Sequence, residues 1–181
     1  MPAVSPAFRQ AVKQLSDKEK EAIILRAARR DAELYDILKY ELLVEVTLEE
    51  VYEEAADRIH ELLINASGRS LSKALTKALR KAMKEIARFK RITKEPKAEV
   101  DLHLYTLRLI FDNFTGQFDS YYKGFFTATA RLLLRTLQLI RKNLHEDYHL
   151  EYKAELDEFL QQIHSRPKHL TVALPKEFDV E

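Results

Sequence analysis

Apolar residues recur every three or four positions along most of this chain, the spacing that places them on one side of an α-helix. Only one proline, Pro96, and three glycines lie between Ala7 and Arg166. Glycine and proline are the residues that most often bend or end helices. The pattern therefore predicts an all-α fold of seven to eight helices.

Capping and breaking residues divide this pattern into separate helices. Ser16 and Glu19 have the spacing of a capping box, and Asp31 is a suitable N-terminal cap for the helix that follows. Pro96 and Gly116 mark later breaks, whereas residues 143–147 leave open whether one helix or two cross them. We expect helices at about residues 6–14, 16–30, 31–42, 47–63, 70–92, 98–114 and 119–140, with a last helical stretch that ends before Pro167.

We expect one all-helical domain over residues 1–166, with 1–47 and 48–166 as possible lobes, and an extended or disordered tail over residues 167–181. Residues 15–45 contain a capped amphipathic helix, an Arg-Asp corner and a second amphipathic helix. This arrangement resembles a HEAT-like or other α-solenoid helical pair. The resemblance implies a solenoid-like pair at the N-terminus, packed on an irregular helical bundle.

The sequence excludes several classes of functional site and argues against a signal peptide and a membrane span. The chain has no cysteine, which excludes disulfides, thiolate metal sites and cysteine nucleophiles. Residues 1–6 lack the basic and apolar segments of a signal peptide. The least polar stretch, residues 121–140, carries three cations (Lys123, Arg131 and Arg135), which argue against a membrane span. We therefore expect a soluble cytoplasmic protein without a cofactor.

Charge is separated along the chain. Residues 31–63 contain eleven acidic and two basic residues, whereas residues 69–97 contain eleven basic and two acidic ones. At about 100° per residue, the cations of the second block form a stripe opposite its apolar positions. The stripe is either a solvated face or a surface for a protein partner or nucleic acid. Its members are Lys73, Lys77, Arg80, Lys84, Arg88 and Arg91.

The histidines offer one metal-site pattern. His145, Glu146 and His149 match H-E-x-x-H, which places two imidazoles and a catalytic glutamate on one helical face in zinc hydrolases. Asp147 lies inside the motif, and no sheet edge is expected beside it. A di-metal site that combines this segment with residues 57–60 is a further alternative. We expect the other histidines considered to be surface or half-buried side chains: His60, His103 and His164.

Seven of the seventeen aromatic residues lie within sixteen positions around Gly116 and Gly124. We interpret them as the core where two helices meet, with an aromatic pocket or protein-binding groove as the alternative. Gly124 would allow another backbone to approach closely there. The seven residues are Phe111, Phe114, Phe118, Tyr121, Tyr122, Phe125 and Phe126.

No nucleophile–base pair, phosphate loop or complete metal constellation identifies an enzyme in this sequence. The interpretation that we favour is a non-enzymatic helical module for protein–protein interaction or scaffolding, with another protein as its partner and no membrane. The first alternative is nucleic-acid binding through the basic helix at residues 69–97. The second is a metal-dependent enzyme that uses His145, Glu146 and His149.

Overall fold

The computed structural model describes residues 3–179, and within them the chain is all-α, with eight α-helices and two short 3-10 helices. This confirms the predicted fold class. Within the same residues, no helix combines the length and the low polarity needed to cross a membrane. The α-helices are α1 Pro6–Gln14, α2 Asp17–Arg30, α3 Ala32–Leu42, α4 Leu48–Ile64, α5 Leu71–Thr93, α6 Pro96–Asn113, α7 Gly124–Asn143 and α8 Glu146–His164; the 3-10 helices are η1 Thr115–Asp119 and η2 Pro167–His169.

Contacts divide the chain into an N-terminal unit, Met1–Thr47, and a C-terminal unit, Leu48–Glu181. The N-terminal unit contains α1, α2 and α3, of which α2 and α3 pack on each other. The capping box of Ser16 and Glu19 is formed, and the Asp31 carboxylate accepts hydrogen bonds from the first amides of α3. None of the described residues 3–47 is buried, so this unit has no core of its own.

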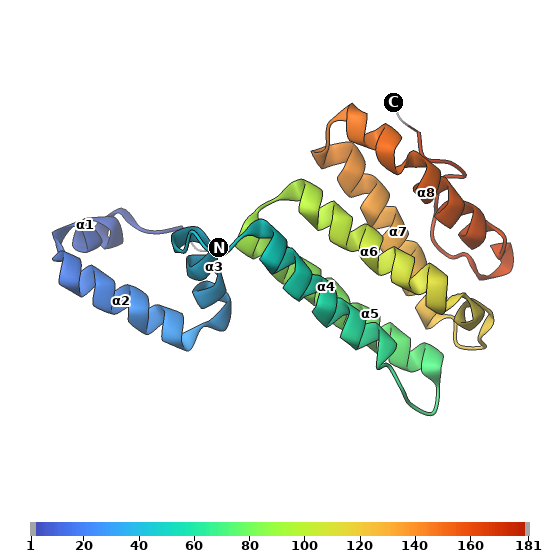
Figure 1. The fold of residues 1–181 in the computed structure, drawn as a ribbon, viewed down its shortest axis with the longest axis horizontal. Helices are drawn as coiled ribbons and strands as arrows, with labels where there is room; N and C mark the ends of the chain where they lie inside the picture. The colour runs from blue at the N-terminus through green and yellow to red at the C-terminus, as the bar shows by residue number, and fades with distance from the viewer. Residues whose placement is uncertain (1–2, 180–181) are drawn as a thin grey trace. The chain divides into compact units, whose positions relative to one another are not determined.

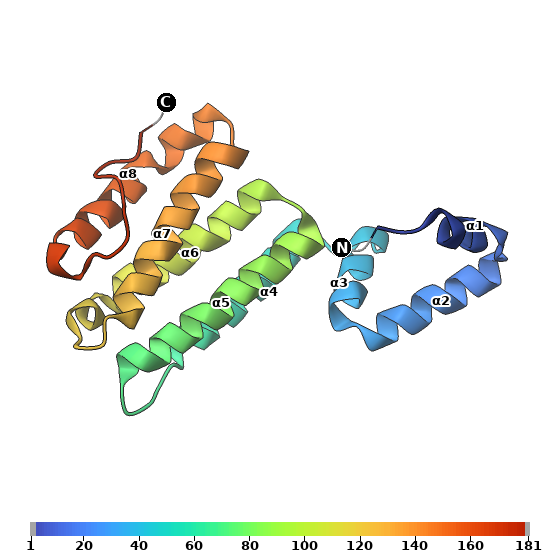
Figure 2. The ribbon, with the colours of Figure 1, turned by 180° about the vertical axis from the view of Figure 1, so that it is seen from behind.

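The C-terminal unit is an array of α4, α5, α6 and α7 with α8 packed against α7. α4 packs beside α6, as Figure 1 shows. α5 packs beside α7, as the opposite view in Figure 2 shows. The positive φ of Gly68 accompanies the turn between α4 and α5. Inward side chains of all five helices form one core, and its largest members include Phe89, Phe118, Phe125 and Phe126.

The segment after α8 folds back onto the C-terminal unit. Leu170, Val172 and Leu174 pack against the core, and Phe178 is completely buried. The Asp157 carboxylate of α8 accepts a hydrogen bond from the Phe178 amide, with 2.6 Å between the two atoms. Residues 167–179 are therefore a packed, mostly irregular segment.

Three helix boundaries differ from the sequence-based expectation or resolve what it left open. The chain breaks at Leu144 and His145, so α7 and α8 are separate helices. α6 begins at Pro96 itself, because proline at the first helical position needs no amide hydrogen. The expected start of the seventh helix near Asp119 was wrong: that residue ends η1, and α7 begins at Gly124.

Candidate functional site

The outward side of α5 carries the basic stripe. Its inward side is buried at Leu75, Ala78 and Ala82, and successive cations therefore fall on the opposite side of the helix. Leu71, in the first turn of α5, is partly exposed. Five stripe residues are exposed, Lys73, Lys77, Arg80, Lys84 and Arg91, whereas Arg88 is half-buried and lies 3.5 Å from Glu85.

α7 lies alongside α5 and runs in the same direction. At their beginnings, the Ser72 hydroxyl donates a hydrogen bond of 2.9 Å to the Tyr122 carbonyl just before α7. Toward their ends, Lys90 of α5 and Arg135 of α7 both act electrostatically on His103 of α6. The two helices thus run side by side (Figure 2).

A groove of about 440 Å³ runs between these two helices. Arg80 of α5 and Arg131 and Arg135 of α7 line it, and no acidic side chain does. The other lining residues are small, apolar or hydroxyl-bearing: Thr76, Leu79, Met83, Gly124, Thr127, Ala128 and Leu132. We call this groove, together with Lys77 and Lys84 on the adjoining surface of α5, the basic groove.

The cations of the basic groove have no counter-ions among residues 3–179. Their side chains make no hydrogen bond or ion pair there, and spacings such as Arg131 and Arg135 place like charges one turn apart. Eight other cations of the C-terminal unit lie within 4 Å of carboxylates, whereas exposed lysines such as Lys142, Lys168 and Lys176 form no such pair within the described residues. These paired cations are Arg58, Arg88, Lys90, Lys97, Arg108, Arg141, Lys153 and Arg166.

The acidic block of α4 does not neutralise the basic groove. Lys81 of α5 and Glu53 of α4 form no ion pair within the described residues. One pair that joins α4 to α5 has the opposite polarity, with Arg58 of the acidic helix 3.7 Å from Glu85 of the basic one. Glu61 lines a different hollow near the α4–α5 turn, which Lys77 also lines. Arg80, Arg131 and Arg135, the cations between α5 and α7, therefore form no ion pair with α4.

Two tyrosines lie just before α7, and the second packs against Gly124, which lines the groove. A Cβ at Gly124 would come within 2.6 Å of the Tyr122 ring, so a larger residue there would require that ring to shift. The close approach expected at this position is therefore made by an aromatic ring, and Lys73 lies 5.3 Å from the centre of the same ring. Tyr121, in contrast, is fully exposed at 102 % of its reference area.

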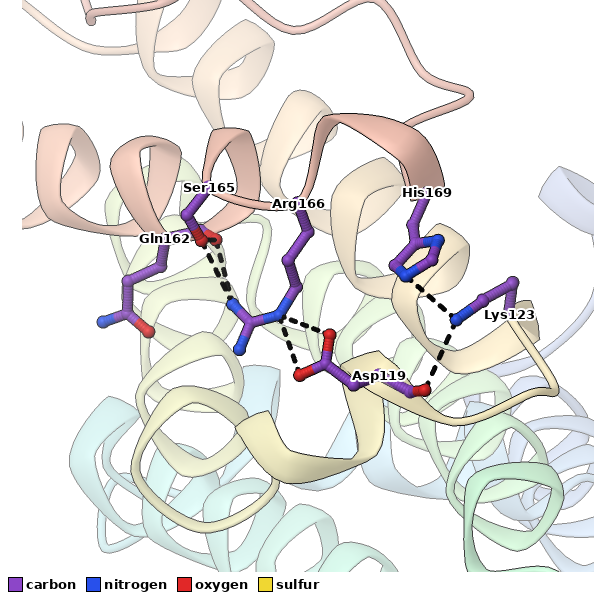
Figure 3. Close-up of polar contacts among 6 residues, drawn as sticks. All are labelled: Asp119, Lys123, Gln162, Ser165, Arg166 and His169. Carbon is purple, nitrogen blue, oxygen red and sulfur yellow. Dashed lines mark hydrogen bonds and ion pairs between the residues drawn. The ribbon is translucent and has the colours of Figure 1, made fainter.

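The loop that carries these tyrosines is fixed on both sides (Figure 3). Before it, the Asp119 carboxylate accepts hydrogen bonds of 3.1 and 3.2 Å from the Arg166 guanidinium. After it, the Lys123 ammonium lies 3.0 Å from the His169 ring and 3.4 Å from the Asp119 carbonyl. η1 and the start of α7 are thereby held to the end of α8 and to η2.

Two polar side chains of α6, Glu99 and His103, are buried near Lys90 of α5 and Arg135 of α7. The Glu99 carboxylate is buried and lies 2.7 Å from the Lys90 ammonium. His103 is completely buried, which corrects the expectation of a surface or half-buried histidine, and neither ring nitrogen has a partner within the described residues. Burial lowers the pKa of His103 to about 3, and the positive charges of Arg135 and Lys90 act in the same direction.

The H-E-x-x-H segment is split by a helix start. His145 is the N-terminal cap of α8, and its ring accepts a hydrogen bond of 3.4 Å from the Asp147 amide. His149 is buried one turn later, with its ring nitrogen 3.2 Å from the Ile140 carbonyl. Among residues 3–179, no three His, Asp or Glu side chains gather closely enough to hold a metal ion. Glu146 lies exposed in the first turn of α8.

The aromatic cluster separates into two groups. Phe111, Phe118, Phe125 and Phe126 are buried and contact one another edge-on or tilted, as in a packed core. Phe114 is partly buried against them. Tyr121 and Tyr122 lie outside this core, and Tyr122 packs against Gly124 of the groove.

The sequence analysis identified the cations of α5 as a candidate surface, but it did not identify the arginines of α7 that line the same groove. Arg131 and Arg135 drew attention only as evidence against a membrane span. Their spacing of one turn, opposite the buried face of α7, was the available signal. That α7 lies beside α5 depends on tertiary packing.

No protein-family model, curated protein or solved structure matches this chain.

Proposed function

We propose that this protein binds nucleic acid through the basic groove, by contacts to the phosphate backbone. The observation that carries the proposal is the set of cations on α5 and α7 that lack counter-ions, beside a groove with no acidic lining. Elsewhere on the same unit, carboxylates neutralise many of the cations. A bound polyanion would relieve the repulsion between neighbouring arginines.

The arrangement favours a chain of phosphates over one small anion. From Lys77 to Lys84 the cations extend for about 10 Å along α5, at 1.5 Å per residue. Arg131 and Arg135 form a second row on α7. Two rows of positive charge along a groove suit an extended backbone, which carries a charge at every nucleotide.

The test measures the affinity of labelled single-stranded and duplex DNA at several salt concentrations. If about three phosphates are neutralised, affinity for the single strand should fall about 20-fold between roughly 50 and 200 mM salt. The variant Arg80→Gln/Arg131→Gln/Arg135→Gln should bind weakly and lose about two to three units of the salt slope. All three side chains line the groove, so the substitutions leave the core untouched.

A matched control removes the same charge elsewhere. Lys142, Lys168 and Lys176 are exposed and lie outside the basic groove, so their triple substitution by glutamine should leave affinity and salt slope unchanged. An absence of binding at about 50 mM salt would overturn the proposal. Displacement of DNA by polyglutamate of equal charge, at equal concentration, would also overturn it and would indicate an acidic protein instead.

A second candidate function is protein–protein interaction through the N-terminal unit. This unit has no buried residue among positions 3–47, and apolar side chains on all three of its helices are exposed, among them Phe8, Ile24 and Leu42. The same positions hold eight basic and eight acidic residues, so two copies would meet without net repulsion. A second copy of the chain is therefore the partner that we propose for this unit.

A further inference from the structure

We infer that the nucleic acid in the basic groove is single-stranded and that one of its bases stacks on Tyr121. This inference rests on the proposed function and adds the class of nucleic acid. Its starting point is an aromatic ring fully exposed to solvent, on a loop next to Gly124, which itself lines the groove. Aromatic rings beside a cationic groove are the usual means of holding unpaired bases.

The loop is rigid although the Tyr121 ring is free. On one side, Asp119 is held by Arg166; on the other, Lys123 contacts His169 (Figure 3). The Tyr122 amide donates a hydrogen bond to the Ser120 hydroxyl, and the Tyr122 carbonyl accepts one from Ser72. Backbone anchored at these points loses little conformational entropy when a base stacks on the ring.

The neighbouring ring cannot take this role equally well. Tyr122 packs against Gly124 and lies under the Lys73 ammonium, which leaves it only 36 % exposed. Tyr122 therefore fixes the loop against α5 and α7, and Tyr121 offers its ring to the ligand. In a duplex the faces of the bases are covered by their stacked neighbours, so the Tyr121 ring favours single strands.

The experiment compares oligothymidine of about 12 nucleotides with an abasic strand of equal length. Both carry the same phosphates, so a difference in affinity measures the contribution of the bases. The full chain should prefer oligothymidine about 5- to 150-fold, which corresponds to one stacked base at 1–3 kcal/mol. Tyr121→Ala should abolish this preference and leave the abasic strand bound with unchanged affinity and salt dependence, whereas Tyr121→Phe should retain the preference.

A second readout and a control separate stacking from other effects. The chain has no tryptophan, so oligothymidine should quench tyrosine fluorescence in the unmodified chain more than in Tyr121→Ala. Tyr35→Ala, which removes an exposed tyrosine from α3, should change neither measurement. Equal, salt-sensitive binding of both strands, or equal affinity for duplex and single strand, would overturn this inference and leave the proposed function standing. Failure of every probe to bind would overturn both.

Discussion

At the scale of the residue, His103 shows how packing changes the chemistry of a side chain. Its imidazole is enclosed in the core, without a hydrogen-bond partner in the described part of the chain, and near two cations. A charged imidazole there would lose its hydration and gain repulsion. The folded protein therefore holds His103 neutral over a wide range of pH.

This environment predicts a stability that falls in acid. An unfolded histidine has a pKa of about 6.5, whereas the folded pKa of His103 is about 3. Between these pH values the unfolded state binds more protons than the folded state. The free energy of unfolding is therefore unaffected by His103 above about pH 6.5 and falls by about 1.4 kcal/mol per pH unit from there toward pH 3. Urea unfolding at about pH 7, 6 and 5 measures how the free energy of unfolding depends on pH.

His103→Leu isolates this contribution because it removes the titrating group and keeps the site apolar. The variant should be at least as stable as the unmodified chain at pH 7, since the imidazole nitrogens have no partner to lose. It should also be less sensitive to acid. His60→Gln is the control, because its side chain is exposed. An equal acid slope in the unmodified chain and His103→Leu would contradict the prediction.

At the scale of the element, the segment after α8 behaves as part of the bundle. Phe178 is buried, its ring lies 5.3 Å from the Arg141 guanidinium, and its carbonyl accepts a hydrogen bond of 2.7 Å from Lys153. Asp157, one turn from Lys153, binds the Phe178 amide. The ion pair of Lys153 and Asp157 thus also clamps the backbone of this segment against α8.

Phe178→Ala should therefore release the segment. Removing a buried phenylalanine side chain costs about 3–5 kcal/mol, and the loss should appear first as detachment of residues 170–179. Limited proteolysis should cut this segment much faster in the variant, and the thermal midpoint should fall. Glu177→Ala changes an exposed neighbour and should do neither. Slow proteolysis of Phe178→Ala would show that other contacts hold the segment.

At the scale of the whole molecule, the two units differ in how they are stabilised. The C-terminal unit buries side chains from all five of its helices. The N-terminal unit has capped, amphipathic helices but no buried residue in the part that the structure describes. Short helices that bury little of their surface are only marginally stable in water. Stability is therefore concentrated in the C-terminal unit.

Hydrogen exchange on the full chain tests this contrast and the proposed self-association together. In dilute solution, the amides of α1–α3 should be nearly unprotected, while those of α5–α7 should exchange slowly. At higher concentration, protection of α1–α3 should rise together with the molecular mass, because copies cover each other's apolar faces. Phe8→Ser/Ile24→Ser should abolish this rise without altering α5–α7, since both side chains are exposed. A mass independent of concentration would contradict self-association.

The sequence by itself determined the all-α class, most helix boundaries and the outward side of the α5 cations. Each follows from helical periodicity and from caps such as Ser16 and Asp31, which act between residues close in sequence. The start of α7 escaped this reasoning, because the position of η1 depends on contacts between Asp119 and the distant Arg166. The HEAT-like resemblance of residues 15–45 stays a prediction.

Only the tertiary structure decided what forms the candidate site. Periodicity gives the outward side of a helix, but not which helix lies next to it, so the meeting of Arg80 with Arg131 and Arg135 followed from packing. Packing also separated two adjacent tyrosines, since Tyr122 closed onto Gly124 while Tyr121 was left in solvent. It likewise buried His103, because the interior of a bundle is defined by several helices together.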